Sequence, residues 1–437
     1  MPDLKQLARR IFHETLASID IPAAFRRKLD RSGSAICCGE QRFDLTQFSA
    51  IRVVAIGKAS LAMARGLADV LAPEFNPDGI LVAPAIASPP PPGFRAIVAG
   101  HPVPTAASFD AARAIFDSLA RCDEKTVVFF LLSGGGSALV ELPLDPKVSL
   151  ADVQELHRVL VTCGASIDEI NTVRKHLSAV KGGRLAVAAP RSWKLTFGVS
   201  DVPAGRESAL ASGPTLPDPT AAADAREVVE RFALLPKLPA SVRAKFAPGG
   251  DLAETPKPGD AAFQRARFAL LLGMDDLFHP AHRNAEAAGC VTICDNSADD
   301  WPVTRAADYL LTLLERQRRA NPGRVVAVIA DGELSSPVIG DGIGGRNSAF
   351  VLECVQRVAG KGIAVLSAGT DGVDGSSPAA GAVADGETLA RAQAAGLDPA
   401  EFTGRSDSYS FFNALGDAVV TGPTGNNLRD LRILLAG

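Results

Sequence analysis

Short runs of apolar residues recur along the chain, and each run ends in a polar stretch rich in glycine. The clearest run is Val-Val-Phe-Phe-Leu-Leu at residues 127–132, which leads directly into Ser-Gly-Gly-Gly-Ser at residues 133–137. An unbroken apolar run of this length indicates a strand that is buried on both faces, as in a parallel sheet. The same pattern predicts further strands at residues 51–57, 79–83, 96–100, 195–199, 268–273, 291–294, 325–330 and 363–367.

Segments with helical spacing lie between these strands. Apolar residues recur every three or four positions over residues 4–29, which predicts one amphipathic helix there. Further helices are predicted after Lys58, from Ser149 onward, in two pieces between residues 167 and 189, and over residues 304–320. Repeated alternation of strand and helix is typical of an α/β fold. We therefore predict a Rossmann-like, doubly wound parallel sheet in the first half of the chain.

A stretch rich in proline and glycine interrupts the alternation at residues 248–260. Such stretches commonly mark domain boundaries, and 437 residues are enough for two or three domains. The sequence therefore predicts an N-terminal Rossmann-like domain over residues 1–247 and a C-terminal α/β domain over residues 260–437. The apolar run at residues 268–273 is then expected to be the first strand of the second domain.

Composition narrows the class of protein. Hydrophobic residues make up 47% and charged residues 22%, and the net charge of −4 favours neither nucleic acid nor an anionic membrane as partner. No apolar run is long enough to span a membrane, and the first residues do not resemble a secretion signal. The seven cysteines are scattered without a Cys-x-x-Cys pair, so we expect neither a disulfide framework nor a zinc site. A cytoplasmic protein acting on small molecules is the expectation.

The loop at residues 133–137 is the first candidate site. Its glycines allow a sharp turn in which backbone N–H groups face a ligand, and clustered N–H groups bind anions. The loop follows a strand, and open α/β sheets bind ligands at the carboxyl ends of their strands. We therefore predict phosphate or substrate binding by the whole loop, although a tight turn without a ligand is the alternative. The residues concerned are Ser133, Gly134, Gly135, Gly136 and Ser137.

Lys58 is the second candidate. It follows the strand at residues 51–57 and is expected to begin a helix. A helix N-terminus attracts anions, and a lysine there adds a positive charge suited to phosphate. The loop is not a Walker A motif, because Arg52 occupies the position of the first required glycine. A solvent-facing lysine at a helix start is the alternative reading.

A second group of cations lies between residues 171 and 184. On a helix, Asn171, Arg174 and Lys175 fall on one face, and Lys181 follows in a Lys-Gly-Gly-Arg stretch. This face suits a phosphate or a carboxylate, so we predict that all four bind substrate. A solvated basic face is the alternative.

The second half carries a similar loop, Gly-Gly-Arg-Asn at residues 344–347. Gly344, Gly345 and Asn347 are expected to offer an open backbone beside the Arg346 guanidinium, which suits bidentate binding of a carboxylate or phosphoryl group. Asp201 and Asp371 each follow a predicted strand, where a carboxylate could hold Mg²⁺. An aspartate in a glycine-rich loop also commonly shapes the turn itself.

Taken together, these stretches resemble the type II glycerate kinase family, the ATP-dependent glycerate 2-kinases, whose C-terminal domain is of MOFRL type. Some members carry the name hydroxypyruvate reductase. The resemblance extends over nearly the whole chain in family order. It rests on residues 57–59, 100–104, 132–139, 171–176, 181–183, 200–202, 211–215, 344–347, 369–372 and 421–425.

The resemblance implies two α/β domains with the active site in the cleft between them. A homo-oligomer is a separate expectation. The resemblance also implies transfer of the γ-phosphoryl group of ATP to the 2-hydroxyl of D-glycerate, with Mg²⁺. The lysine of the family's Gly-Lys-Ala motif and the arginine of its Gly-Gly-Arg-Asn motif correspond to Lys58 and Arg346, which are the implied catalytic residues. A Lys, an Arg and Mg²⁺ are chemically sufficient, because phosphoryl transfer needs mainly positioning and charge neutralisation.

The chain departs from the family pattern in several loops, so a closely related hydroxy acid is also a candidate substrate. Acidic residues are usual where Ala204, Gly205 and Arg206 stand, and Gln-Glu is usual where Ser348 and Ala349 stand. Pro378 replaces a usual aspartate, and Asp-Gly-Glu-Leu at residues 331–334 replaces Gly-Gly-Glu-Thr.

Two other functions stay open at this point. An NAD(P)H-dependent hydroxypyruvate reductase would need a Gly-x-Gly-x-x-Gly turn with an acidic residue about 20 positions later, and neither residues 57–60 nor 134–138 provide it. A family member that binds its ligand without turnover is the other alternative, because acidic residues are missing from the loops named above.

Overall fold

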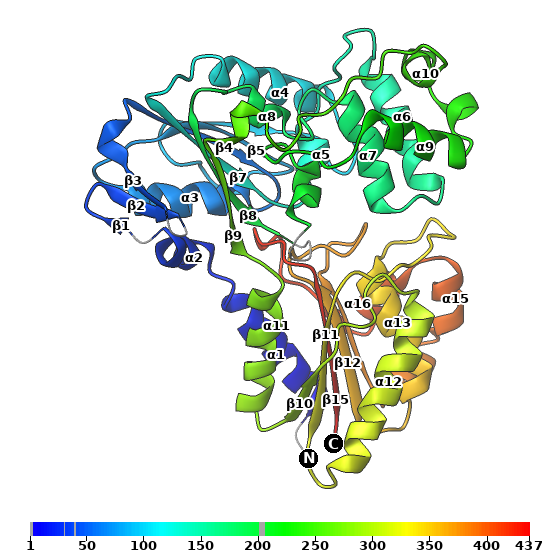
Figure 1. The fold of residues 1–437 in the computed structure, drawn as a ribbon. Coiled ribbons are helices and arrows are strands. Elements are labelled where there is room, and N and C mark those ends of the chain that lie inside the picture. The colour runs from blue at the N-terminus through cyan, green and yellow to red at the C-terminus, as the bar shows by residue number, and fades with distance from the viewer. Residues whose placement is uncertain (1–2, 30, 39–40, 201–205) are drawn as a thin grey trace. The chain divides into compact units, whose positions relative to one another are not determined.

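The structure, a computed structural model, describes residues 3–29, 31–38, 41–200 and 206–437 (Figure 1). The chain divides into two compact units. One is Ile21–Leu272, which we call the insert unit. The other combines Met1–Asp20 with Gly273–Gly437, and we call it the terminal unit because it contains both ends of the chain.

The insert unit is built on a six-stranded sheet in the order β6-β5-β4-β7-β8-β9, in which every pair is parallel. Its strands are β4 (Ala50–Ile56), β5 (Asp78–Ala83), β6 (Phe94–Val98), β7 (Thr126–Leu132), β8 (Trp193–Val199) and β9 (Ala266–Leu272). Counted from β4, the order is 3-2-1-4-5-6, which is that of a Rossmann fold and confirms the predicted doubly wound sheet. The direction of winding reverses between β4 and β7, and ligands bind at this point in such sheets.

Burial explains why β7 forms at the centre of this sheet. All of its residues are buried, and Val128 and Phe130 belong to a core that Ala112 and Ile115 of the helix α4 (Ala106–Leu119) also enter. A separate helical cluster with its own apolar core contains α6, α7, α9 and α10. The helices are α2 (Ile21–Lys28), α3 (Ser60–Leu71), α5 (Gly136–Leu139), α6 (Leu150–Thr162), α7 (Ile167–Leu177), α8 (Arg184–Val187), α9 (Ala222–Arg231) and α10 (Ala240–Phe246). Three short antiparallel strands complete the unit, β1 (Arg31–Ser32), β2 (Ala35–Cys38) and β3 (Gln41–Asp44).

The terminal unit contains a six-stranded mixed sheet in the order β10-β11-β15-β12-β13-β14. Its central strand β15 is antiparallel to both neighbours, whereas β10 and β11 are parallel. The strands are β10 (Val291–Cys294), β11 (Val326–Asp331), β12 (Ile363–Gly369), β13 (Gly381–Asp385), β14 (Ala418–Val419) and β15 (Asp430–Ala436). Because β15 runs the opposite way, its first residue lies at the same sheet edge as the last residues of β11 and β12.

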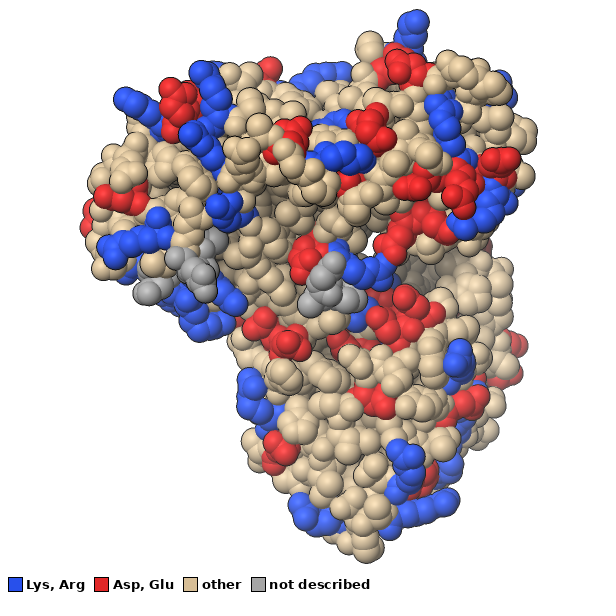
Figure 2. Space-filling view, viewed as in Figure 1, with Lys and Arg blue, Asp and Glu red and all other residues tan. Residues whose placement is uncertain are grey.

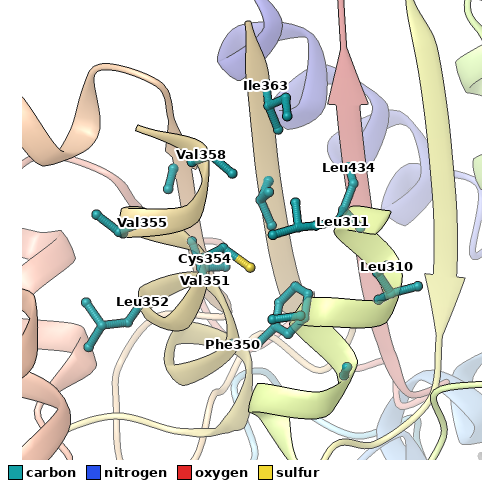
Figure 3. Packing of buried hydrophobic residues seen from close by; sticks show 14 of the residues in the cluster. Leu310, Leu311, Phe350, Val351, Leu352, Cys354, Val355, Val358, Ile363 and Leu434 are labelled. Carbon is teal, nitrogen blue, oxygen red and sulfur yellow. The ribbon is translucent and has the colours of Figure 1, made fainter. Parts of the chain in front are cut away.

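Helices cover both faces of this sheet. The helices α1 (Leu4–Ala17) and α11 (Asp275–Ala287) lie on one face, and α12 (Val303–Ala320) and α13 (Arg346–Val358) lie on the other (Figure 1). Leu310 of α12 and Phe350 of α13 meet Leu434 of β15 in one apolar core, which is drawn in Figure 3. Three shorter helices follow, α14 (Thr388–Ala394), α15 (Pro399–Gly404) and α16 (Ser408–Ala414).

The opening helix and the domain boundary differ from the sequence prediction. Residues 4–29 form two helices rather than one, and Pro22 lies in the first turn of α2, where a missing N–H costs nothing. The helix α1 then packs in the terminal unit, where the Lys5 ammonium lies 3.0 Å from a carboxylate oxygen of Asp417. The strand β9, which was expected to begin the second domain, pairs with β8 instead and is the last strand of the first sheet. The chain consequently passes from one unit to the other between residues 20 and 21 and between residues 272 and 273, not at residues 248–260.

Figure 2 shows acidic and basic side chains intermixed on the visible face of each unit. Among the residues that the structure describes, no helix is both long enough and apolar enough to cross a membrane.

Candidate active site

The loops after β4 and β7 form one structure at the point where the sheet reverses. The Ser133 N–H donates to the Ile56 carbonyl at 3.0 Å, and the Lys58 N–H donates to the Gly134 carbonyl at 3.0 Å. The Ser133 hydroxyl in turn accepts the Ala59 N–H at 3.0 Å. Gly57 allows this approach, because it has a φ of +126° and a Cβ there would lie 2.2 Å from Ser133 Oγ. Ser133 is therefore a buried link between the two loops.

Gly134 and Gly136 of the glycine loop are buried, and Gly135 is half-buried. Within the described ranges of the chain, no hydrogen bond engages the N–H groups of Gly134, Gly135 or Gly136. Gly135 adopts a left-handed conformation with φ of +86°, so the chain turns sharply there. A cluster of N–H groups without partners attracts an anion, and binding of a ligand by this loop stays a prediction.

Lys58 and His101 flank this loop. A Cβ at Gly135 would lie 3.0 Å from His101 Cδ2 and 3.6 Å from Lys58 Cγ. Lys58 is half-buried and His101 is exposed. His101 is not among the site residues predicted from the sequence. Its signal was present, because Gly100 and His101 follow the β6 strand at the same edge of the sheet.

A chain of polar side chains extends the site from the glycine loop to α7. Ser137 Oγ lies 2.7 Å from Ser212 Oγ, and Ser212 Oγ donates to Asn171 Oδ1 at 3.1 Å. Ser212 ends a 3₁₀ segment, η2 (Glu207–Ser212). The structure thus brings the predicted residues Ser137 and Asn171 together, and Ser212 is the residue between them that sequence reasoning missed.

Arg346 dominates the corresponding edge of the terminal unit. Its Nη1 donates to Glu333 Oε2 at 2.9 Å, its Nη2 lies 2.7 Å from Glu333 Oε1, and its Nε donates to Asp430 Oδ2 at 2.5 Å. Burial alone acts to lower the pKa of Arg346, but the two carboxylates raise it above its ordinary value. About a third of the side chain, 35%, is still exposed. Arg346 is thus a permanent cation that Glu333 and Asp430 hold in one orientation.

The residues around Arg346 have a supporting role. Asp374 accepts the N–H groups of Asn347 and Ser348 at 2.9 and 2.8 Å and therefore caps the start of α13. Burial raises the pKa of Asp374 to about 6, although these donors act to lower it. Gly345 permits the approach, since a Cβ there would lie 2.3 Å from Asp374 Oδ1. Ser348, a departure from the expected motif, also donates its hydroxyl to Asp374 at 2.6 Å.

The predicted openness of the loop at residues 344–347 is therefore not found. Asn347 is buried, and its side-chain carbonyl accepts the Ser367 hydroxyl at 2.6 Å. The Gly344 N–H donates to Ser376 Oγ at 3.2 Å. These neighbours fix the start of α13 and with it the position of Arg346, rather than offering a free backbone to a ligand.

Comparison with known proteins decides the family. Residues 7–247 match a family described as a domain of unknown function (DUF4147), and residues 326–430 match the MOFRL family. The chain is 35% identical to a D-glycerate 2-kinase of Thermotoga maritima, over 87% of this chain and 89% of that protein. It is 31% identical to a glycerate 2-kinase of Pyrococcus horikoshii, over 99% of this chain and 97% of that protein. The chain belongs to the glycerate 2-kinase family.

Solved structures agree with this membership. A glycerate kinase of Thermotoga maritima superposes with a TM-score of 0.82 at 33% identity, and 99% of each chain is covered. A relative from Agrobacterium vitis, 36% identical over 99% of this chain and 94% of its own length, is named a putative hydroxypyruvate reductase. The second name used within the glycerate 2-kinase family is thus present among the relatives.

Two cations that the sequence predicts to bind substrate are paired with carboxylates inside the insert unit instead. Lys181 is fully buried, and its ammonium contacts Glu141 Oε2. Lys175 pairs with the buried carboxylate of Asp218 at 3.2 Å, and although burial acts to raise the pKa of Asp218, Lys175 holds it below its ordinary value. Each lysine is neutralised inside the unit, so neither is open to a phosphate.

Arg174 also lies away from the glycine loop. It lines a small cavity of the helical cluster together with Glu141 and His157, and burial lowers its pKa. Its Nε has no hydrogen-bond partner within the described part of the chain. Of the predicted residues in this segment, only Asn171 reaches the site.

The Lys181–Glu141 pair gives the first testable prediction. We expect Lys181→Met to lower the free energy of unfolding by about 3–5 kcal/mol, because the Glu141 carboxylate would be left buried without its cation. Urea denaturation measures the change. The double variant Lys181→Met/Glu141→Leu removes both charges and should recover most of the loss. A single variant as stable as the wild type would contradict a buried pair.

His157 gives a second prediction, on acid stability. Burial is the main cause that lowers its pKa to about 2, with Arg174 and Lys181 adding to the effect, and this outweighs the attraction of Glu141 at 3.9 Å. Below pH 6.5 the unfolded chain binds a proton that the folded protein does not, so stability falls as the pH drops from 6.5. We expect His157→Leu to lose less stability than the wild type between pH 7.5 and 5 in urea denaturation. Equal losses would contradict a neutral His157.

The predicted metal ligands remain predictions. Asp371 Oδ1 accepts the Val373 N–H at 3.0 Å and so shapes its own turn. Asp201 lies outside the described residues, as do Ala204 and Gly205 of the unusual loop. Among the residues that are described, no group of three or more His, Cys, Asp or Glu side chains could hold a metal ion. Mg²⁺ needs fewer, since one or two carboxylates with substrate phosphates commonly hold it.

Proposed function

We propose that the protein transfers the γ-phosphoryl group of ATP to the 2-hydroxyl of D-glycerate, or of a closely related small hydroxy acid. The products are 2-phosphoglycerate and ADP. The observation that carries this proposal is the joined loop, by which we mean the hydrogen-bonded loops after β4 and β7. There Lys58 lies beside backbone N–H groups that no hydrogen bond engages in the described chain. Family membership supports the same reaction, because the relatives named glycerate 2-kinase match over most of their length.

The chemistry required matches what the two sheet edges provide. Phosphoryl transfer depends mainly on positioning and on neutralising the charge of the transferring group. We assign phosphate binding to the Lys58 ammonium and the N–H groups of Gly134, Gly135 and Gly136. We assign to Arg346 the stabilisation of the transferring group, since its charge is permanent and its orientation is fixed by Glu333 and Asp430.

Mg²⁺ belongs to the proposal through its chemistry with ATP. When bound, it neutralises phosphate charge and orients the phosphate chain. Asp371 and Asp201 stay the proposed carboxylates, each needing only the phosphates and water to complete a magnesium shell. A cytoplasmic location and a homo-oligomer likewise remain predictions from the sequence.

Release of ADP tests the proposal. Purified protein is incubated with Mg·ATP and one acid at a time, namely D-glycerate, L-glycerate, threonate, erythronate or tartronate. We expect turnover on D-glycerate, with phosphorus NMR placing the phosphate on the 2-hydroxyl. Turnover only on a longer acid would shift the substrate to that acid. No ADP from any of them would contradict the proposal.

The same purified protein distinguishes the kinase from the two alternative functions, a reductase and a binding protein. A hydroxypyruvate reductase would consume NADH with hydroxypyruvate, although the turn after β4 reads Gly-Lys-Ala-Ser and lacks the glycine pattern of dinucleotide-binding proteins. A binding protein would release no ADP and consume no NADH, yet its melting temperature would rise with ATP or the acid.

A further inference from the structure

The polar chain Ser137–Ser212–Asn171 has a direction that limits what it can bind. Asn171 Oδ1 is a carbonyl oxygen and can only accept, so the Ser212 hydroxyl gives its one hydrogen to Asn171. The contact of 2.7 Å between Ser137 and Ser212 must then use the hydrogen of Ser137. Ser137 is left with lone pairs only and faces a ligand as an acceptor.

Asn171, at the other end of this series of three side chains, is a donor. The Asn171 side-chain nitrogen has no hydrogen-bond partner within the described residues and is not among their fully buried unpaired atoms. Ser212 between the two ends is completely buried, whereas Ser137 is half-buried. The corner beside the glycine loop therefore offers one acceptor and one donor in a fixed relation.

Backbone strain shows that the position of Ser212 is imposed by the fold. Ala211, Ser212 and Gly213 have successive φ values of +50°, +59° and +61°, a left-handed turn that residues with a Cβ rarely adopt. The Gly182 N–H donates to the Ser212 carbonyl at 3.0 Å, and the Gly183 N–H donates to the Gly213 carbonyl at 2.7 Å. Strain of this kind persists only where the surroundings hold it, and it concentrates at functional sites.

The buried Lys181 explains why Gly182 and Gly183 can hold the left-handed turn at Ser212. Lys181 is anchored to Glu141 directly before Gly182 and Gly183, whose N–H groups reach the strained segment. The Lys-Gly-Gly-Arg motif is therefore a scaffold under Ser212. Its role in the site is indirect, through the placement of one hydroxyl.

We propose that Ser212 is a positioning residue, and that Ser137 and Asn171 bind the hydroxy-acid substrate rather than ATP. A substrate hydroxyl would donate to Ser137, and an oxygen of the acid group would accept from Asn171. ATP phosphates carry only acceptors at neutral pH and find no donor at Ser137, whereas the neighbouring N–H groups and Lys58 offer them donors. The inference rests on the proposed function for the identity of the acid.

Calorimetric binding tests the proposal without requiring turnover. The dissociation constant is measured for D-glycerate, for D-lactate, which lacks the 3-hydroxyl, and for 3-hydroxypropionate, which lacks the 2-hydroxyl. We expect Ser137→Ala and Ser212→Ala each to weaken D-glycerate binding about 10-fold, while ATP binding changes less than 2-fold. The matched control is Ser241→Ala, whose hydroxyl bonds Asp152 in the helical cluster of the same unit.

The analogues identify the hydroxyl that Ser137 contacts. In the wild type, removal of that hydroxyl should weaken binding about 10-fold, and in Ser137→Ala the same removal should have no effect. Asn171→Asp keeps the acceptor for Ser212 but replaces the donor by a carboxylate, so it should weaken acid binding more than Ser137→Ala does. Thermal melts confirm that each variant is folded.

Three results would overturn the proposal. They are a wild type that does not bind D-glycerate, a Ser137→Ala variant that discriminates the analogues as the wild type does, and a loss confined to ATP binding. Failure of the kinase proposal is seen separately, as the absence of ADP from a protein that still binds the acid.

Discussion

Arg346→Ala is expected to lower kcat/KM for ADP formation by about 1,000-fold or more. An arginine that neutralises a transferring phosphoryl group contributes factors of this size. In this chain the effect should be near the upper end, because Glu333 and Asp430 orient the guanidinium before any ligand arrives. Removing it would also leave those two carboxylates near the phosphate, where they would repel it.

Arg346→Lys distinguishes charge from geometry. A lysine keeps the charge but does not reproduce the paired contact with Glu333 together with the contact to Asp430. We expect it to retain the fold and to lose at least about 100-fold in kcat/KM. Arg319→Ala, which changes an exposed arginine in the last turn of α12, is the matched control. Near-normal turnover of Arg346→Ala would remove Arg346 from the proposed machinery.

Lys58→Ala is expected to lower kcat by about 100- to 1,000-fold and to raise the KM for ATP. The reason is the loss of a positive charge beside the N–H groups of the glycine loop. The fold should survive, because the bond that joins Lys58 to the loop runs from its backbone N–H to Gly134 and does not involve the side chain. Steady-state kinetics and a thermal melt measure the two effects.

Lys58→Arg and Lys125→Ala serve as controls for the Lys58→Ala variant. The arginine keeps the charge in a larger shape and should recover part of the activity. Lys125 lies in a turn directly before β7, so its loss should leave the kinetics unchanged. If Lys58→Ala kept the wild-type kcat and KM for ATP, the phosphate-binding role of the joined loop would be wrong.

The sequence was sufficient to predict the sheet of the insert unit. Central parallel strands are buried on both faces, so β7 is visible as an uninterrupted apolar run that ends in the loop of residues 133–137. β4 is visible as an apolar run that only Arg52 interrupts and that ends in Gly57. β15 was missed because its sequence, Asp-Leu-Arg-Ile-Leu-Leu-Ala, places the fully buried Arg432 among apolar residues.

The candidate cations show what sequence reasoning could not separate. Lys58, Lys175 and Lys181 all follow the same chemical logic as phosphate ligands. Only the fold shows that Lys175 pairs with Asp218, 43 positions away, and that Lys181 pairs with Glu141, 40 positions away. Ser212 was missed for a related reason, since its role comes from a strained turn held by a distant loop.

The placement of α1 has a consequence for how the chain folds as it is synthesised. The helix packs against β12, β13 and β15, and its Lys5 binds Asp417, which is 412 positions later in the chain. Residues 21–272 can form their own sheet once they have left the ribosome, because that sheet needs no strand from elsewhere. The first helix must instead wait, with its apolar face uncovered, until nearly the last residue is made. Nascent chains that stop before β15 should therefore expose α1 to proteases and chaperones although the insert unit is already native.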